Sequence, residues 1–425
     1  MGEQVDATRP QEEEKYAAWL AIDWADKKHV WAMISADSSQ RQQGELQASP
    51  EAVEAWSREL LGRWPGQKIA VALEQKRGPL LCLLSKYRDL VLYPVHPATV
   101  SRMRSALYPS QSKNDPKDAE LLLDILLHHR KHLRRLNSDT EKTRKLQMLV
   151  EDRRTLVDQQ KAYSNQLQAR LKLYFPQAVR WLGDLNTELA YQFLQRWPTL
   201  PVLQQAHGKT VERFFHQHHC RSEVLLQRRL EEIPDAVVAT RDEAIVECAT
   251  AMVKALLELL RVLRIQIAAF QQQIEELTAV HPELPWVASL PGAGPVMEPR
   301  LIAALGTERE RFRNAGDLQN ATGISPVQQS SGGTQWTHFR WACPKFTRQT
   351  FHEWAGHSIA HCSWAKAYYD AQRFKNKGHH AAVRALAFKW QRILFRCWKD
   401  KQPYDEQKHL HALRHRGSPY APPLA

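Results

Sequence analysis

The chain has 425 residues, more than a single hydrophobic core usually holds, so two or three domains are expected. Lys and Arg outnumber Asp and Glu by 59 to 46, and the net charge of +13 favours a polyanionic partner. The six cysteines form no CxxC pair, and no apolar stretch is long enough to span a membrane. We therefore expect a cytoplasmic protein with free thiols and without a disulfide framework or membrane anchor.

The first third of the chain alternates short apolar runs with segments of helical pattern. The runs predict strands at 18–22, 29–34, 69–73 and 90–95. Strands alternating with helices predict an α/β sheet, and ligands gather where the strands of such sheets end. Asp23 directly follows the first run and Glu74 directly follows the third. Both acids are therefore predicted at strand ends.

Two further acids open a predicted helix. In Asp115-Pro116-Lys117-Asp118, Pro116 suits the first helical position, which puts Asp115 at the N-cap and Asp118 in the first turn. One interpretation is helix capping, which contributes about 1 kcal/mol. The other joins both carboxylates to Asp23 and Glu74 as ligands of Mg²⁺, which prefers oxygen ligands. Two ions roughly 3.5–4 Å apart would stabilise the attacking and leaving oxygens of a phosphate, so this interpretation predicts phosphodiester chemistry.

The middle of the chain is predicted to be helical. Two stretches without Pro or Gly, 138–174 and 242–280, repeat apolar residues at helical spacing and predict an antiparallel coiled-coil stalk, with a helical insertion at 176–241. Basic residues of the first stretch, including Arg153 and Arg154, form either a solvated charged face or a nucleic-acid contact. The cluster His216-Gln217-His218-His219-Cys220 matches no zinc-ligand spacing, so no zinc site is expected there.

A glycine turn opens the last part of the chain. Leu290-Pro291-Gly292-Ala293-Gly294-Pro295 resembles the hairpin of a helix-hairpin-helix module, in which Gly292 and Gly294 let backbone N–H groups approach a phosphate. The alternative is an ordinary turn between two helices.

A small-residue loop is predicted at 329–333, where a serine is either a nucleophile or a turn residue. Residues 331–400 then carry +9 of the net charge, with aromatic residues interleaved among the basic ones. Many of these aromatics must be core, but basic charge mixed with stacking surfaces is typical of nucleic-acid binding. We expect Arg340, Lys345 and Arg348 to contact nucleic acid.

These motifs together resemble the DEDD transposases of insertion-sequence family one-ten. The resemblance rests on Asp23, Glu74, the signature Asp115-Pro116-Lys117-Asp118-Ala119, the glycine hairpin and the Ser-Gly loop, and it covers nearly the whole chain. Segments that are similar to one long subgroup are 72–80, 92–95 and 341–346. One departure is local: many members carry Thr-Gly soon after the second acid, whereas Gln75-Lys76-Arg77-Gly78 stands here.

The resemblance implies a domain order. It implies a RuvC-like domain of ribonuclease-H fold at 1–135 that binds Mg²⁺ through the four acids. A coiled-coil stalk at 136–282 and a mostly helical transposase domain at 283–400 follow, with a tail at 401–425. By the family's spacing the catalytic serine lies five residues after Pro326, which is Ser331, with Ser330 as the nearby rival.

The resemblance also implies an activity and partners. Family members resemble site-specific recombinases more than cut-and-paste transposases, and a bridge RNA that pairs with donor and target DNA guides them. The resemblance implies that Ser331 attacks the DNA and forms a phosphoserine link. The resemblance further implies that the protein forms a dimer, and a tetramer on DNA. It also implies a place in the nucleoid region of a prokaryotic cytoplasm. No side chain identifies itself as the general base for Ser331.

Other functions remain open from sequence. A structure-selective nuclease of the Holliday-junction-resolving kind needs the four acids but not Ser331. A DNA invertase would differ in the arrangement of its substrates more than in residues. A non-catalytic RNA-binding protein would tolerate the loss of both Asp23 and Ser331.

Overall fold

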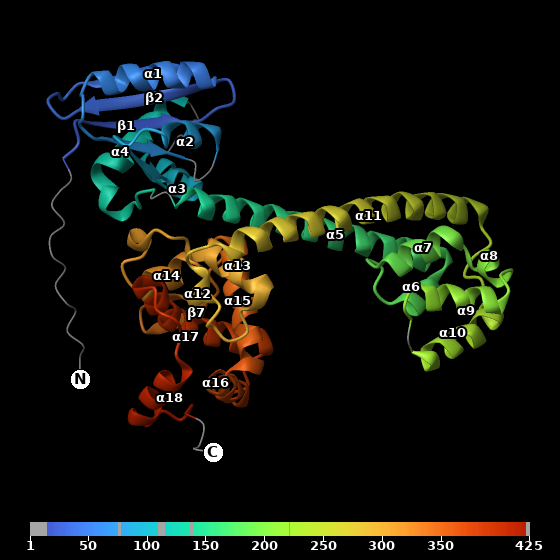
Figure 1. The fold of residues 1–425 in the computed structure, drawn as a ribbon. Coiled ribbons are helices and arrows are strands. Elements are labelled where there is room, and N and C mark those ends of the chain that lie inside the picture. Colours follow the sequence, from blue (N-terminus) through green and yellow to red (C-terminus); the bar gives the residue numbers. More distant parts are fainter. Residues whose placement is uncertain (1–14, 75–77, 109–114, 137–138, 221, 422–425) are drawn as a thin grey trace. The chain divides into compact units, whose positions relative to one another are not determined.

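The computed structural model describes residues 15–74, 78–108, 115–136, 139–220 and 222–421, without the side chain of Asp115. The chain forms two compact units, Met1–Ser138 and Asp139–Ala425, here called unit 1 and unit 2 (Figure 1). Within the described residues, no helix is both long and apolar enough to cross a lipid bilayer.

Unit 1 is built on a five-stranded mixed sheet with the strand order β3-β2-β1-β4-β5. The β1–β2 and β2–β3 pairs are antiparallel, and the β1–β4 and β4–β5 pairs are parallel. The interior strand β4, between β1 and β5, is buried at all five positions, as its continuous apolar run predicts. The α/β prediction is confirmed. The strands are β1 (Ala18–Asp23), β2 (Lys28–Ser35), β3 (Arg41–Gln47), β4 (Ile69–Leu73) and β5 (Leu90–Pro94).

Helices cover both faces of this sheet. Alternate residues of β1 point to opposite faces, so Leu20 and Ile22 pack with α1 and α2, while Ala21 packs with α3 and α4. Small side chains on the second face let α4 lie close to β1, β2 and β4. The helices are α1 (Pro50–Gly62), α2 (Pro79–Leu84), α3 (Pro97–Leu107), α4 (Asp115–His129) and the 3₁₀ turn η1 (Arg130–His132).

Two long helices form the backbone of unit 2. The helices α5 (Glu141–Tyr174) and α11 (Glu243–Ala279) run along one another (Figure 1). The Thr140 side chain caps α5, and the Asp242 side chain caps α11 by accepting from two backbone N–H groups. Both proline-free and glycine-free stretches are thus helical. That the two helices supercoil as a coiled coil stays a prediction.

Five short helices join α5 to α11. They pack around an aromatic cluster in which Phe175, Phe193 and Phe215 are fully buried. Ring contacts between such side chains add about 0.5–1.5 kcal/mol each to their burial. The helices are α6 (Pro176–Leu182), α7 (Glu188–Arg196), α8 (Leu200–Gln204), α9 (Gly208–Gln217) and α10 (Glu223–Asp235).

The remaining helices form a C-terminal body around a tryptophan core. Trp354, Trp364, Trp390 and Trp398 are fully buried, and Trp390 contacts both Trp354 and Trp364. These rings hold the body together and offer no stacking surface to a ligand. The elements are α12 (Leu284–Val287), α13 (Gly294–Leu305), η2 (Arg309–Arg311), α14 (Ala315–Ala321), α15 (Lys345–His361), α16 (Ser363–Phe374), α17 (His379–Asp400) and α18 (Glu406–His415).

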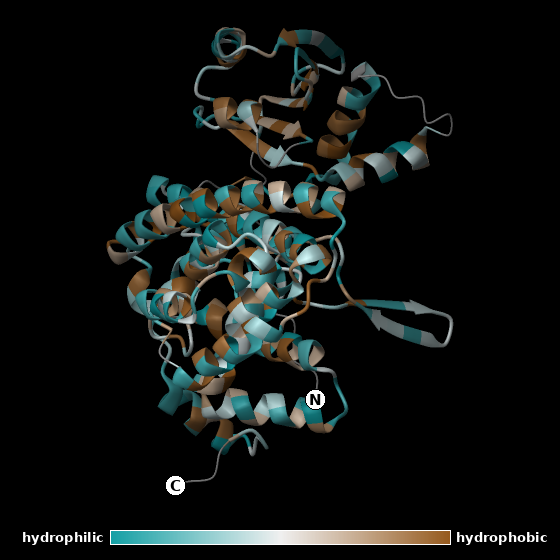
Figure 2. Cartoon of the chain, turned by 90° about the vertical axis from the view of Figure 1, so that its right-hand side faces the viewer, coloured by the Kyte–Doolittle hydropathy of each residue, from teal (hydrophilic) through white to brown (hydrophobic). Residues whose placement is uncertain are grey.

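A two-stranded hairpin projects from this body (Figure 2). It consists of β6 (Val327–Ser331) and β7 (Thr334–His338), paired antiparallel. Nearly every residue of both strands is exposed. The predicted loop at 329–333 is therefore wrong: most of it is strand, and the turn itself is confined to Gly332 and Gly333.

Candidate functional site

Two of the predicted acids stand on adjacent strands of unit 1. Asp23 is the last residue of β1, and Glu74 directly follows β4. The parallel register pairs Ile22 with Leu73, so the next residues, the two acids, follow at the same end of the sheet. Both side chains are half-buried. The apolar strands thereby fix the backbone positions of Asp23 and Glu74 relative to one another.

Asp118 is the most deeply buried of the described acids of this set. It lies in the first turn of α4, is 3% exposed, and accepts a hydrogen bond from Nε of Arg104 at 2.8 Å. Arg104 comes from the last turn of α3. A buried carboxylate needs such a partner because its desolvation is costly. The ion pair holds Asp118 in one orientation and ties α3 to α4.

The donor chemistry of these acids suits a divalent metal. Carboxylate oxygens are the ligands that hard cations prefer, and here they come from two strand ends and from a helix packed on those strands. Among the described residues, no three His, Cys, Asp or Glu side chains are grouped closely enough to hold an ion. The side chain of Asp115 lies outside the described residues, as do Gln75, Lys76 and Arg77. A site formed by all four acids stays a prediction.

A buried histidine that the sequence analysis did not single out lies next to the end of β1 that carries Asp23. His29, on β2, is 3% exposed, and its Nδ1 accepts a hydrogen bond from the backbone N–H of Ala25 at 3.3 Å. Burial lowers the pKa of His29, so the ring is neutral at pH 7. It holds the turn that follows Asp23. A lone histidine in an apolar run carries no local signal of such a role, and neither does Arg104.

Ser331 lies at the end of β6, next to the hairpin turn. It pairs with Thr334 across the turn, and Gly332 adopts a φ of +57°, which favours glycine. Side chains alternate along a strand, so Ser331 and Gln329 share one face and Ser330 points to the other. Gln329 lies opposite Trp336 and accepts a hydrogen bond from its indole Nε1 at 2.7 Å. Ser331 therefore shares its face with Trp336, whose side chain is 45% exposed.

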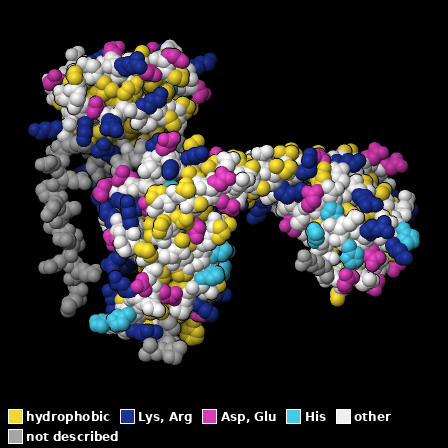
Figure 3. All heavy atoms as spheres, viewed as in Figure 1, with side chains coloured by type: hydrophobic (Ala, Val, Ile, Leu, Met, Phe, Trp, Pro, Cys, Tyr) yellow, Lys and Arg dark blue, Asp and Glu magenta, His cyan; other side chains and the backbone are white. Residues whose placement is uncertain are grey.

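Two of the predicted nucleic-acid contacts hold the base of the hairpin. Arg340 donates from Nε to the carbonyl oxygen of Ser325 at 3.2 Å. Arg348 donates from Nη1 to the carbonyl oxygen of Arg340 at 3.0 Å and stacks over Phe339 at 4.2 Å. Lys345 is exposed at the start of α15. Lys and Arg side chains line one flank of the C-terminal body in Figure 3.

The glycine turn before α13 is packed against α15. A Cβ on Gly292 would lie 2.9 Å from the backbone carbon of His357, and the carbonyl oxygen of Pro291 accepts a hydrogen bond from Trp354. A Cβ on Gly294 would meet open space. Gly292 is thus explained by close helix packing. The first helix of the predicted helix-hairpin-helix, α12, is a single turn, and phosphate binding by Gly292 and Gly294 stays a prediction.

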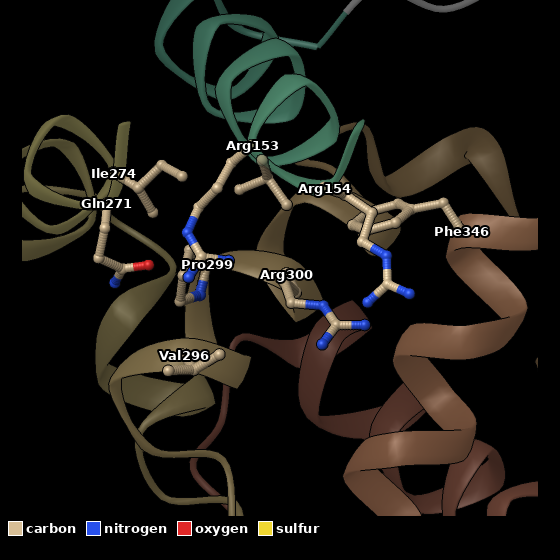
Figure 4. Close-up of a pocket in the computed structure, with 9 residues that line it drawn as sticks. Arg153, Arg154, Gln271, Ile274, Val296, Pro299, Arg300 and Phe346 are labelled. Atoms are coloured by element: carbon tan, nitrogen blue, oxygen red, sulfur yellow. The ribbon is translucent and has the colours of Figure 1, made fainter. Parts of the chain in front are cut away.

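Arg153 and Arg154 lie on α5 and line a pocket together with Arg300 of α13 (Figure 4). The sequence did not single out Arg300, because it lies in an apolar helix 146 positions beyond Arg154. Three arginines from two helices thus line one pocket.

Comparison with known proteins covers both units. Residues 20–176 match a transposase family model for the DEDD domain of IS110 elements, and residues 285–370 match the model of the IS116/IS110/IS902 transposase family. The chain belongs to the IS110 family of DEDD transposases. Its mixed sheet is consistent with a ribonuclease-H-like DEDD domain, and transposases of this type typically use a divalent metal. The protein is a DNA transposase.

Several relatives of this transposase come from actinobacterial insertion elements. An IS117 mini-circle protein of Streptomyces coelicolor is 24% identical over 93% of this chain and 97% of its own length. The 43.6 kDa protein of insertion element IS110 from the same organism is 27% identical over 73% of this chain and 76% of its own length. The 42 kDa protein of IS900 from Mycobacterium paratuberculosis is 26% identical over 91% of this chain and 96% of its own length. The similarity thus extends through both units.

Proposed function

We propose that this transposase cuts and rejoins DNA through a covalent link to Ser331. The Ser331 Oγ attacks a DNA phosphorus and loses its proton, a P–O bond of the phosphodiester breaks, and the leaving sugar hydroxyl takes up a proton. The phosphoserine link keeps the energy of the phosphodiester. A hydroxyl end of another strand then attacks the same phosphorus, which releases the serine and joins the strands.

The observation that carries this proposal is the position of Ser331 on an exposed hairpin. Its hydroxyl is open to a large substrate, and the half-exposed indole of Trp336 lies on the same face of the hairpin. Bases stack on such rings with about 1–3 kcal/mol per base. Ser330 faces away from Trp336. These features favour Ser331 over Ser330 as the nucleophile.

The proposed chemistry also uses the acids of unit 1. Asp23, Glu74, Asp115 and Asp118 would hold one or two Mg²⁺ ions. When bound, such ions stabilise charge on the oxygens of a transferring phosphate. Arg104 is a positioning residue in this scheme, because its guanidinium fixes the orientation of the buried Asp118 carboxylate.

Guidance by an element-encoded bridge RNA and assembly as a dimer, with a tetramer on DNA, complete the proposal. The family membership supports both, and the +9 charge of residues 331–400 supports nucleic-acid binding. Basic surface binds either nucleic acid, because the phosphates dominate affinity.

A recombination assay with donor DNA, target DNA and the element's RNA tests the proposal. Ser331→Ala should lower recombination by on the order of 10⁴-fold or more, as loss of a nucleophile does elsewhere. The matched variant Ser330→Ala should recombine normally. Changing the pairing sequence of the RNA should redirect the product to a matching target. If Ser331→Ala still cuts DNA, water is the nucleophile and a resolvase-type nuclease replaces this proposal.

A further inference from the structure

Three arginines line one small pocket in unit 2. Arg153 and Arg154 project from α5, and Arg300 projects from α13 (Figure 4). The other residues that line the pocket are Val150, Gln271, Ile274, Val296, Pro299 and Phe346. In this view Arg153 reaches toward Pro299, and the guanidinium groups of Arg154 and Arg300 lie on the side nearer Phe346. Asp139, two residues before α5, pairs with Arg311 and accepts a hydrogen bond from the backbone N–H of Thr307 in the loop after α13. These contacts hold the start of α5 to the end of α13.

Among the described residues, direct ion pairs reach two of the three arginines. Arg300 pairs with Glu353, and Arg154 pairs with Asp158 on its own helix. Among the described residues, no carboxylate forms an ion pair with Arg153. The Nε atoms of Arg153, Arg154 and Arg300 are buried, and within the described part of the chain none of them has a hydrogen-bond partner. Buried donors without an acceptor are rare and costly, and a bound ion is one explanation for them.

The electrostatics favour an anion at this place. Burial, together with the charges of Arg300 and Arg154, lowers the pKa of Arg153, and the carboxylate of Glu275 opposes part of this shift. Two like charges beside a half-buried guanidinium repel it, and an anion between them would remove that repulsion. Planar guanidinium donors match the oxygen pairs of phosphate groups.

The size of the pocket limits the ligand. Its volume is about 30 Å³, far below the roughly 300–1,000 Å³ of sites that enclose small molecules. A space of this size accepts a phosphate group that enters from outside, but it is too small for a nucleotide base. A phosphate within a nucleic-acid backbone meets this condition.

We propose that the pocket formed by Arg153, Arg154 and Arg300 binds one backbone phosphate of the nucleic acid on which the transposase acts. The inference deepens the proposed function, on which it rests, by assigning a specific anchoring point on α5 and α13. The phosphate belongs either to DNA or to the guide RNA, and the chemistry recognised is the same.

Equilibrium binding of the full-length protein to element-end DNA and, separately, to the element's transcript tests this inference. Arg153→Gln should weaken binding to one of these ligands by about tenfold, and it should reduce the slope of log K against log salt by about 0.7–0.9, the loss of one phosphate contact. Arg170→Gln, an exposed arginine on the same helix, is the control and should change neither. The ligand for which Arg153→Gln reduces the salt slope is the one whose phosphate binds in the pocket.

A second readout avoids nucleic acid altogether. Inorganic phosphate at millimolar concentration should raise the melting temperature of the wild type and of Arg170→Gln more than that of Arg153→Gln. Phosphate binding is measured here without strand cleavage. The result therefore does not depend on whether Ser331 is the nucleophile. Unaltered affinity and salt slope in Arg153→Gln with both ligands, or equal losses in Arg153→Gln and Arg170→Gln, would overturn the inference.

Discussion

The acids of unit 1 and the serine of unit 2 stand in opposite structural settings. Asp23 and Glu74 end strands whose apolar residues are almost fully buried, and Asp118 is itself buried beside Arg104. Ser331 ends a hairpin strand with no core of its own, attached to the body by contacts at its base. Packing positions the acids. No such packing surrounds Ser331, whose position depends on the strand pairing of the hairpin.

This contrast separates two ways of damaging the protein. A change beside the acids acts through packing and charge, so stability and activity should fall together. A change at the hairpin tip should alter activity and leave the stability of unit 2 unchanged. Variants of both kinds test the contrast.

The largest effect on stability is expected from Arg104→Gln. Removing one partner of a buried ion pair typically costs about 3–5 kcal/mol, because the other charge stays buried without compensation. Asp118 would be that charge. Urea unfolding of the full chain measures the loss of stability, and hydrogen exchange of the backbone amides measures it locally in α4. Both measurements are made with a chelator present.

The double variant Arg104→Gln with Asp118→Asn is the control for this prediction. It removes both charges and should recover most of the lost stability. If Arg104→Gln is as stable as the wild type, Arg104 does not hold Asp118 as the structure shows.

A smaller loss is expected from Gly292→Ala in the C-terminal body. The new Cβ would meet the backbone of His357, and φ is +71°, so we expect a loss of about 2–4 kcal/mol from overpacking and strain. Gly294→Ala meets open space and should cost about 1 kcal/mol from its φ of +53° alone. Chemical unfolding of both variants compares them. Equal losses would show that Gly292 is not needed for the approach of α15.

The stability of unit 2 should depend on pH through His352. Burial and the nearby His380 and Arg384 lower its pKa to about 4 in the folded protein, against an ordinary value near 6.5. Between these values the unfolded chain binds a proton that the folded chain does not, so stability falls as pH drops from 6.5 to 4. His352→Gln should flatten this dependence. His361→Gln, exposed on the same helix, should leave the melting curve's pH dependence as in the wild type.

The smallest stability effect is expected at the hairpin tip. Ser331→Ala should change the free energy of unfolding by no more than about 0.5 kcal/mol, because the side chain is exposed. Trp336→Ala removes one hydrogen bond to Gln329 and should cost about 1 kcal/mol. Calorimetry on both variants checks this, and a loss above 2 kcal/mol in Ser331→Ala would mean that the tip is part of a packed structure.

Burial decided which elements could be predicted from the sequence. The strands β1, β2, β4 and β5 were predicted because their side chains must be apolar on one or both faces. Strand β3 is an exposed edge with the sequence Arg-Gln-Gln-Gly-Glu-Leu-Gln, so it lacks that pattern. The hairpin strands β6 and β7 lack it for the same reason, and small residues there suggested a loop.

The candidate site was predictable in the same uneven way. Asp23 and Glu74 follow apolar runs, so their placement at strand ends could be inferred from sequence. Arg104 and Arg300 meet their partners only through the packing of separate helices, and no local spacing predicts such contacts.

The measurement that tests the central claim most directly is a search for a covalent protein–DNA link. The protein is incubated with Mg²⁺, the element's RNA and element-end DNA, and the trapped adduct is mapped by mass spectrometry. We expect a phosphodiester-linked nucleotide on Ser331, absent from Asp23→Ala and present in Ser330→Ala. Cleaved DNA without any adduct, or an adduct on Ser330, would contradict the account.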